Sequence, residues 1–200
     1  MIKLYDLGLS GNCHKIRLLL SMLALPYETV AMNLGAGEHR QPGYLALNPF
    51  GTVPTLTDGE IVIRDSHGIL VYLAKRYGGS AWWPEDAALQ GQIASWLSTA
   101  ANEIAAGPNS LRLEKKFGRA IDHGHSLSVT ARTLTIIDAH LAPRQWLVGA
   151  QVTIADLAIY PYLALAPEGG VDLSTYPNIR RWFGDIRGLK GYIGMPGIQE

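Results

Sequence analysis

Residues 48–66 read NPFGTVPTLTDGEIVIRDS, which places two short apolar runs on either side of the dipeptide Asp58-Gly59. An Asp-Gly pair between apolar runs is a strong signal for a β-hairpin. The stretch closes with Asp65-Ser66, which is typical of the start of a helix. We therefore expect two antiparallel strands that lead directly into a helix ending at Gly78-Gly79.

The residues before this hairpin predict a strand, a loop, a helix and a second strand. Apolar and polar residues alternate over 2–6, and apolar residues recur at helical spacing over 16–23 until a proline ends the helix. Residues 27–32 then predict another strand, and 44–47 a short helix. A β-α-β-α-β-β-α unit with a sheet of mixed direction is therefore expected over residues 1–78.

The rest of the chain contains no comparable strand pattern and predicts an all-helical domain over residues 87–200, joined by a linker at 79–86. Its helices are expected near 87–106, 112–141, 154–166 and 176–187. The fold class is thus an α/β domain followed by an all-α domain.

One motif in the helical part marks the start of a helix. Thr153 and Asp156 have the spacing of a capping box, with Asp in place of the usual Glu. The Thr153 hydroxyl is expected to accept from the first turn of the helix, while the Asp156 carboxylate accepts from the Thr153 N–H. We interpret this motif as structural.

Composition excludes several classes of function. Among the 200 residues, 17 Lys and Arg balance 17 Asp and Glu, so no net charge is available to hold nucleic acid or an anionic membrane. No apolar run approaches the ~20 residues that cross a bilayer.

Cys13 is the single cysteine, which allows no internal disulfide and favours a reducing, cytoplasmic setting. His123 and His125 are badly spaced for a shared metal, and no metal is expected.

Three segments, taken in order, resemble the cytosolic glutathione transferases, in particular their bacterial, theta-like, zeta-like and beta-like branches. They are SGNCHKIR at 10–17, NPFGTVPTL at 48–56 with the following Asp65-Ser66, and VTIADL at 152–157. The resemblance implies a thioredoxin-like N-terminal domain and an all-helical C-terminal domain. It also implies a homodimeric detoxification enzyme that conjugates glutathione, its co-substrate, to small hydrophobic electrophiles.

The resemblance assigns thiol activation to the loop before the first helix. A thiol with a pKa near 8.5 is only about a few per cent ionised at neutral pH, so a thiolate needs stabilisation. In theta-like and zeta-like members a Ser in this stretch donates to the sulfur, which implies Ser10. Asn12 could act through its amide, and Cys13 through a mixed disulfide, although a small buried Cys is the simpler interpretation. Tyr5 is a weaker rival.

The second segment is implied to hold the peptide-like middle of glutathione. If Pro54 is cis, as in the family, Val53 presents its backbone so that the ligand pairs with it like an added strand. Ser66 would bind the γ-glutamyl carboxylate at the start of a helix, where free N–H groups favour an anion. The Asp65 carboxylate would face the ligand ammonium, with a simple N-cap as the alternative role.

The glycine carboxylate has no obvious cation, because Phe50, Gly51 and Thr52 supply none. His39 and Arg40 in the preceding loop are the nearest substitutes. From the helical half, Glu103 resembles a beta-like residue that reaches the glutathione of the partner subunit.

A stabilised thiolate serves more than one reaction. The leading expectation is a transferase, and a glutathione-dependent isomerase or disulfide reductase is the enzymatic alternative. A non-catalytic binding module that keeps the fold is the alternative from a different class.

Overall fold

The computed structural model describes residues 1–198, and within them four strands form one sheet. The strands are β1 (Ile2–Asp6), β2 (Tyr27–Ala31), β3 (Thr55–Asp58) and β4 (Ile61–Arg64), in the spatial order β2-β1-β3-β4. β1 is parallel to β2 and antiparallel to β3, and β3 is antiparallel to β4. The predicted sheet of mixed direction is confirmed.

The hairpin is confirmed, but its turn lies one residue later than expected. Asp58 pairs with Ile61 in the β3–β4 ladder, so the turn residues are Gly59 and Glu60 rather than Asp58 and Gly59. Gly59 has φ of 60°, and a two-residue hairpin turn of type II′ requires a positive φ at this first position. Of the pair Asp58-Gly59, the glycine is therefore the residue that marks the position of the turn.

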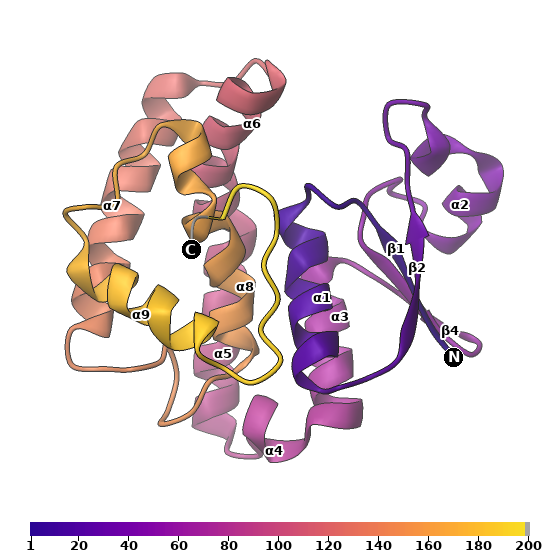
Figure 1. The fold of residues 1–200 in the computed structure, drawn as a ribbon, viewed down its shortest axis with the longest axis horizontal. Coiled ribbons are helices and arrows are strands. Elements are labelled where there is room, and N and C mark those ends of the chain that lie inside the picture. Colours follow the sequence, from indigo (N-terminus) through magenta and orange to yellow (C-terminus); the bar gives the residue numbers. More distant parts are fainter. Residues whose placement is uncertain (199–200) are drawn as a thin grey trace.

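Two helices cover the face of the sheet that points toward the helical half of the molecule (Figure 1). They are α1 (Gly11–Met22) and α3 (Ser66–Leu73), which pack against each other. A 3-10 turn (Glu38–Arg40) and α2 (Pro42–Leu47) lie on the opposite side. This arrangement places the starts of α1 and α3 beside the end of β1.

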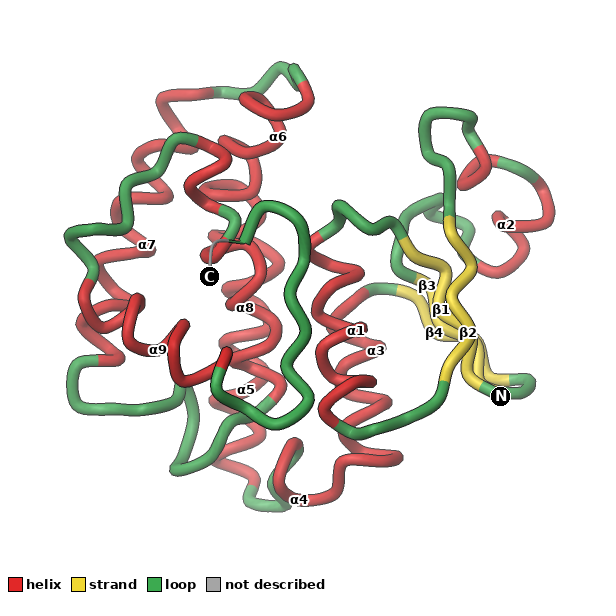
Figure 2. The backbone as a smooth tube through the Cα atoms, viewed as in Figure 1, coloured by secondary structure: helices red, strands yellow, loops and turns green. Residues whose placement is uncertain are grey.

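The remainder of the described chain is helices and loops (Figure 2). The helices are a π-helical turn Ala74–Gly78, α4 (Gly79–Trp82), α5 (Ala87–Thr99), a π-helical stretch Ala100–Asn109, α6 (Ser110–Phe117), α7 (His123–Leu141), α8 (Ile154–Ala164), a 3-10 turn Ala166–Gly169 and α9 (Pro177–Arg187). Among residues 1–198, no helix has the length and apolar character to cross a membrane.

Two expected helix boundaries are wrong. Helix does not stop at Gly107-Pro108, because the π-helical stretch carries the chain through Pro108, and the Ser110 hydroxyl donates to the Ala105 carbonyl at 3.0 Å. The single helix expected over 112–141 is divided into α6 and α7. Gly118 ends α6 with φ of 66°, the left-handed conformation in which glycine commonly terminates helices.

α8 joins the two halves of the molecule. Every one of its residues is buried, and it packs against α1, α3 and α5. Its start carries the predicted capping box, which is confirmed: the Thr153 N–H donates to Asp156 Oδ2 at 2.9 Å, and Thr153 Oγ1 accepts from the Ala155 N–H at 3.3 Å. The direction in which α8 leaves this cap determines what it presents to α1.

The Asp156 carboxylate also bonds beyond its own helix. Its Oδ1 accepts from the Leu147 N–H at 3.0 Å and from Trp182 Nε1 at 2.9 Å. Burial raises the pKa of Asp156 to about 6, against the lowering effect of these donors. One carboxylate therefore ties together the loop after α7, the start of α8 and α9.

We expect Asp156→Asn to lower the free energy of unfolding by about 3 kcal/mol, because an amide NH₂ would face N–H donors in a buried site. Urea unfolding measures the change. Asp122→Asn is the matched control, since Asp122 caps α7 at an exposed site by accepting from the His125 N–H at 2.9 Å, and Asn caps helices equally well. Similar urea midpoints for Asp156→Asn and Asp122→Asn would contradict a special structural role for the Asp156 carboxylate.

Candidate functional site

Ser10 lies at the end of the loop that follows β1 and is the N-cap of α1. Its backbone is extended, with φ of −85° and ψ of 121°, and its Oγ accepts from the Cys13 N–H at 3.3 Å. The residue is half-buried. A hydroxyl that accepts from the backbone still has its own hydrogen to donate, and the helix N-terminus adds a positive field. The position suits stabilisation of a small anion.

Two arginines hold the loop that carries Ser10. Arg17 of α1 donates to the Gly8 carbonyl at 3.1 Å and forms an ion pair with Asp6. Arg112 of α6, which is only 2% exposed, donates to the Leu9 carbonyl at 3.1 Å. The loop is thus fixed from the sheet side and from the helical side at once. The sequence analysis missed Arg112, because no local pattern relates it to Leu9.

Cys13 is fully buried, and its Sγ accepts from the Leu7 N–H at 3.4 Å. Burial, reinforced by the charge of Asp6, raises the pKa of Cys13 to about 12. The lowered pKa that a mixed-disulfide role would need is therefore absent. These observations support the interpretation of Cys13 as a small buried residue.

Gly11 lies against the ring of Tyr162, which belongs to α8. A Cβ added at Gly11 would meet the Tyr162 ring at 2.8 Å, so the ring lies directly on the first turn of α1. Burial raises the pKa of the Tyr162 phenol. The sequence analysis assigned no role to Tyr162.

The Val53–Pro54 peptide bond is cis. Thr52, which precedes Val53, is held by two side chains. Its carbonyl accepts hydrogen bonds from Asn48 Nδ2 at 2.7 Å and from the Tyr44 hydroxyl at 2.6 Å. The Tyr5 ring packs at 5.5 Å from the Tyr44 ring, which supports a packing role for Tyr5. Because β1 and β3 are antiparallel, the start of β3 lies beside the end of β1.

His39 lies beside the loop that leads into this segment. Its carbonyl oxygen is 3.0 Å from the place of a Cβ at Gly51, which has φ of 57°. Within residues 1–198, His39 Nδ1 is buried and has no hydrogen-bond partner. The neighbouring Arg40 is exposed.

Asp65 is the N-cap of α3. Its Oδ1 accepts from the His67 N–H at 2.8 Å and from the Gly68 N–H at 3.4 Å, and its φ is 69°. Two of the N–H groups at this helix start therefore already have an acceptor. Ser66 follows directly as the first residue of α3 and is 2% exposed.

Lys15 is buried between α1 and α3, which the sequence analysis did not foresee because lysine is rarely buried. Its Nζ is 3.1 Å from His67 Nε2 and 5.5 Å from the centre of the Tyr162 ring. Burial lowers the pKa of Lys15 to about 7, with Asp65 acting in the opposite direction. Burial and Lys15 together lower the pKa of His67 to about 4.

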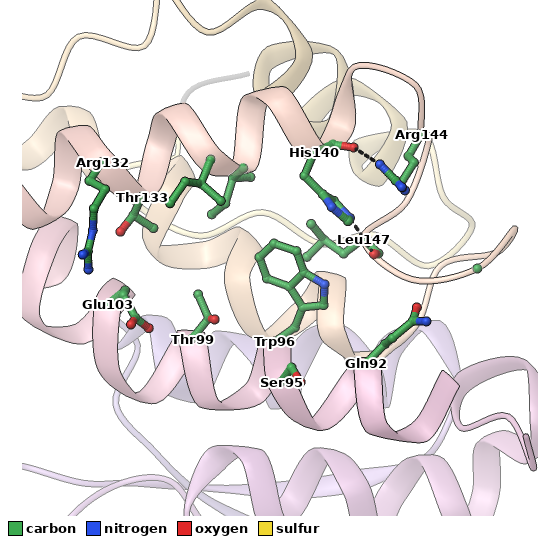
Figure 3. Close-up of a pocket in the computed structure, with 13 residues that line it drawn as sticks. Gln92, Ser95, Trp96, Thr99, Glu103, Arg132, Thr133, His140, Arg144 and Leu147 are labelled. Carbon is green, nitrogen blue, oxygen red and sulfur yellow. Dashed lines mark hydrogen bonds between the residues drawn. The ribbon is translucent and has the colours of Figure 1, made fainter. Parts of the chain in front are cut away.

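Glu103 lies apart from these groups. It lines a cavity of about 670 Å³ between α5 and α7. Figure 3 shows Glu103 and Thr99 on one wall, with Arg132 and Thr133 facing them from α7. None of the other candidate residues lines this cavity.

Of the two histidines considered for a metal, His123 has Nδ1 at 2.5 Å from Glu114 Oε2. In the part of the chain that the structure describes, no three His, Cys, Asp or Glu side chains come together at a metal-binding distance.

Comparisons with known proteins agree with the resemblance seen in the sequence. The glutathione S-transferase N-terminal domain family matches residues 4–81, and the glutathione S-transferase C-terminal domain family matches residues 115–189. Glutathione S-transferase GstB of Escherichia coli K12 is 31% identical over 192 residues, which covers 92% of this chain and 91% of the relative. Maleylacetoacetate isomerase of Pseudomonas aeruginosa is 31% identical over 191 residues, which covers 90% of this chain and 88% of the relative.

A glutathione S-transferase crystal structure from Xanthobacter autotrophicus Py2 has the same fold. It superposes with a TM-score of 0.91 at 28% identity and covers 98% of each chain.

The buried amine gives a prediction for stability against pH. When the pKa of an amine is lower in the folded protein than in the unfolded chain, the folded protein binds fewer protons than the unfolded chain at any pH between the two pKa values. The free energy of unfolding therefore rises with pH across that window. For Lys15 the window runs from about 7 to 10.5. We expect the free energy of unfolding of the wild type, minus that of Lys15→Met, to rise by at least about 2 kcal/mol from pH 7 to pH 10.

Denaturant unfolding at several pH values checks this expectation. Lys3→Met is the control, because it removes one amine from an exposed pair with Glu28. A constant difference between the wild type and Lys15→Met across the window would contradict the burial of a titrating amine.

Proposed function

This chain belongs to the glutathione S-transferase family of enzymes, and we propose that it conjugates glutathione to a small, largely apolar electrophile by stabilising the thiolate with Ser10. Glutathione is the substrate that members of this family use. The Ser10 hydroxyl would donate its hydrogen to the sulfur, and the N-terminus of α1 would add its field.

The observation that carries the proposal is the state of the Ser10 hydroxyl. Its oxygen already accepts the Cys13 N–H, so the hydroxyl is oriented while its hydrogen remains available. Leu9, which is 37% exposed in the same loop, offers apolar surface for the second substrate. Asn12 is retained as a secondary donor, through its amide.

The environment of Cys13 supports Ser10 over a thiol mechanism. A fully buried thiol with a raised pKa is neither ionised at neutral pH nor reachable by a disulfide. The same reasoning argues against a disulfide reductase that works through Cys13.

We propose that glutathione lies along Val53 and Pro54, with its γ-glutamyl carboxylate at Ser66. The Asp65 carboxylate caps α3 through Oδ1, and its 57% exposed side chain can still face the ligand ammonium. His39 is the better candidate for the glycine carboxylate, because its Nδ1 is buried without a partner among the described residues, whereas Arg40 is exposed.

We also propose the homodimer that is usual in the family, acting in the cytoplasm. Glu103 could serve the site only from the partner subunit, since in its own chain it lines the separate cavity between α5 and α7. Light scattering measures the mass of the protein in solution directly, and so tests whether two chains associate.

Glutathione-dependent isomerisation is the second candidate function. The observation that favours it is the 31% identity to the maleylacetoacetate isomerase of Pseudomonas aeruginosa. Both reactions begin from a stabilised thiolate, so assays of aryl-halide conjugation and of cis–trans isomerisation distinguish them.

We expect Ser10→Ala to lower kcat/KM for conjugation by roughly 10- to 100-fold, because a hydrogen bond to a charged sulfur contributes about 1.5–3 kcal/mol. Ser10→Thr keeps a hydroxyl and should retain most of the activity. Cys13→Ala should change kcat/KM by less than about threefold, since that residue serves packing. Steady-state kinetics with an aryl halide, and calorimetric titration with glutathione, measure these effects.

An active Ser10→Ala protein together with an inactive Cys13→Ala protein would overturn the assignment of Ser10. Absence of glutathione binding at millimolar concentration would favour the non-catalytic module.

A further inference from the structure

We propose that Arg112 is a positioning residue, whose guanidinium fixes the peptide group between Leu9 and Ser10 and so determines where the Ser10 hydroxyl meets the glutathione sulfur. The inference rests on the proposed role of Ser10. It gives a residue of α6, in the helical half, a part in the activation of a thiol that the first half of the chain binds.

The first step is the contact between the two halves. Arg112 is 2% exposed, and its Nη2 donates to the Leu9 carbonyl at 3.1 Å, although 103 positions separate the two residues in the chain. A charged donor forms a stronger hydrogen bond than a neutral one. The contact therefore ties the loop after β1 to α6.

The second step is that the guanidinium is itself held in place. Its Nε donates at 2.6 Å to Oε2 of Glu168, which lies in the 3-10 turn after α8. Burial opposes ionisation of Glu168, but hydrogen bonds from Lys116 and Arg112 bring the pKa of its carboxyl below the usual value. The carboxylate is therefore charged at neutral pH. Because the guanidinium is planar and rigid, bonds at Nε and at Nη2 together define its plane.

The turn that carries Glu168 packs directly on α6. A Cβ added at Gly169 would lie 2.8 Å from the backbone nitrogen of Arg112 and 3.0 Å from the carbonyl carbon of Leu111. The backbones of the turn and of α6 therefore approach each other as closely as a glycine permits. This packing fixes Glu168 relative to Arg112.

The third step follows the backbone on either side of Ser10. The peptide group that precedes Ser10 is held at both ends, because its carbonyl accepts from Arg112 and its N–H donates to the Leu7 carbonyl at 2.8 Å. The peptide group that follows is held by the His14 N–H, which donates to the Ser10 carbonyl at 3.0 Å. Since each peptide group is planar, the two orientations set φ and ψ of Ser10 and thereby the direction of its Cβ.

These hydrogen bonds differ in where their partners come from. The bonds to Leu7 and His14 join Ser10 to residues three and four positions away, so they belong to the local structure of the loop and the helix start. A peptide group held only at its N–H can pivot about that bond, and a second bond at its carbonyl prevents the movement. The helical half supplies this second bond through Arg112.

The chain offers a control with the same bonding pattern. Arg181 of α9 donates through Nη2 to the carbonyls of Leu141 and Arg144 at 2.8 and 2.6 Å, and through Nη1 to Asp185 Oδ2 at 3.0 Å. Like Arg112, it joins backbone carbonyls to a carboxylate. Its partners all lie in the helical half, so Arg181→Met removes an equivalent set of bonds without affecting the Ser10 loop.

The test is the pH dependence of kcat/KM for an aryl halide at saturating glutathione, whose midpoint reports the pKa of the bound thiol. We expect Arg112→Met to move the midpoint upward by roughly half a unit, which is about a threefold loss of thiolate below the midpoint. Glu168 keeps Lys116 as its partner in this variant. Arg181→Met should leave the midpoint unchanged, and a shift of equal size there would contradict the inference.

Arg112→Lys is the second variant if Arg112→Met folds poorly. It keeps a positive charge beside Glu168, but a single ammonium group does not reproduce the planar fork that holds the carboxylate and the Leu9 carbonyl together. Its midpoint should therefore also move upward. Urea unfolding of each variant shows that the kinetics are those of folded protein.

A double-mutant cycle separates this inference from the proposed function. If Arg112 acts through Ser10, Arg112→Met has no further effect on the midpoint in a Ser10→Ala background, and a further shift of the full size there would overturn the inference. Unchanged midpoints for both Arg112 variants, beside a shifted Ser10→Ala midpoint, would overturn the inference alone. An unchanged midpoint for Ser10→Ala would overturn the proposed function, and with it the role of Arg112.

Discussion

The buried carboxylate of Asp156 is the interaction on which the rest of the structure depends. It accepts hydrogen bonds from the loop after α7, from the start of α8 and from the indole of α9, so three segments of the helical half meet at one side chain. A charged group with several donors tolerates few orientations, because each misplaced donor would remain buried without a partner. The direction of α8 follows from this constraint.

α8 in turn brings the helical half to the thioredoxin-like half. It is buried along its whole length, and it places Tyr162 on the first turn of α1. Arg112 reaches the same region from α6 and donates a hydrogen bond to the Leu9 carbonyl. Its Nε also donates to Glu168 Oε2 at 2.6 Å. The loop that carries Ser10 is therefore shaped by residues from both halves, although every residue of that loop belongs to the first.

Local sequence patterns were sufficient where the interacting residues are close in the chain. The glycine of the hairpin, the capping box at Thr153 and the helix start at Asp65 each involve groups within about four residues of one another, and each could be predicted. The errors have a different origin. Pro108 was expected to break a helix, but packing against neighbouring helices maintains a wider helical turn there.

The sequence by itself determined the mixed sheet followed by helices, the family to which the chain belongs, and the position of a hydroxyl at a helix N-terminus, because these depend on short-range spacing. Only the tertiary structure decided the surroundings of that hydroxyl. The burial that raises the pKa of Cys13, the buried amine of Lys15 and the approach of Tyr162 to Gly11 arise from contacts between α1 and distant segments. Desolvation and close packing act at those contacts, and no local pattern in the chain encodes them.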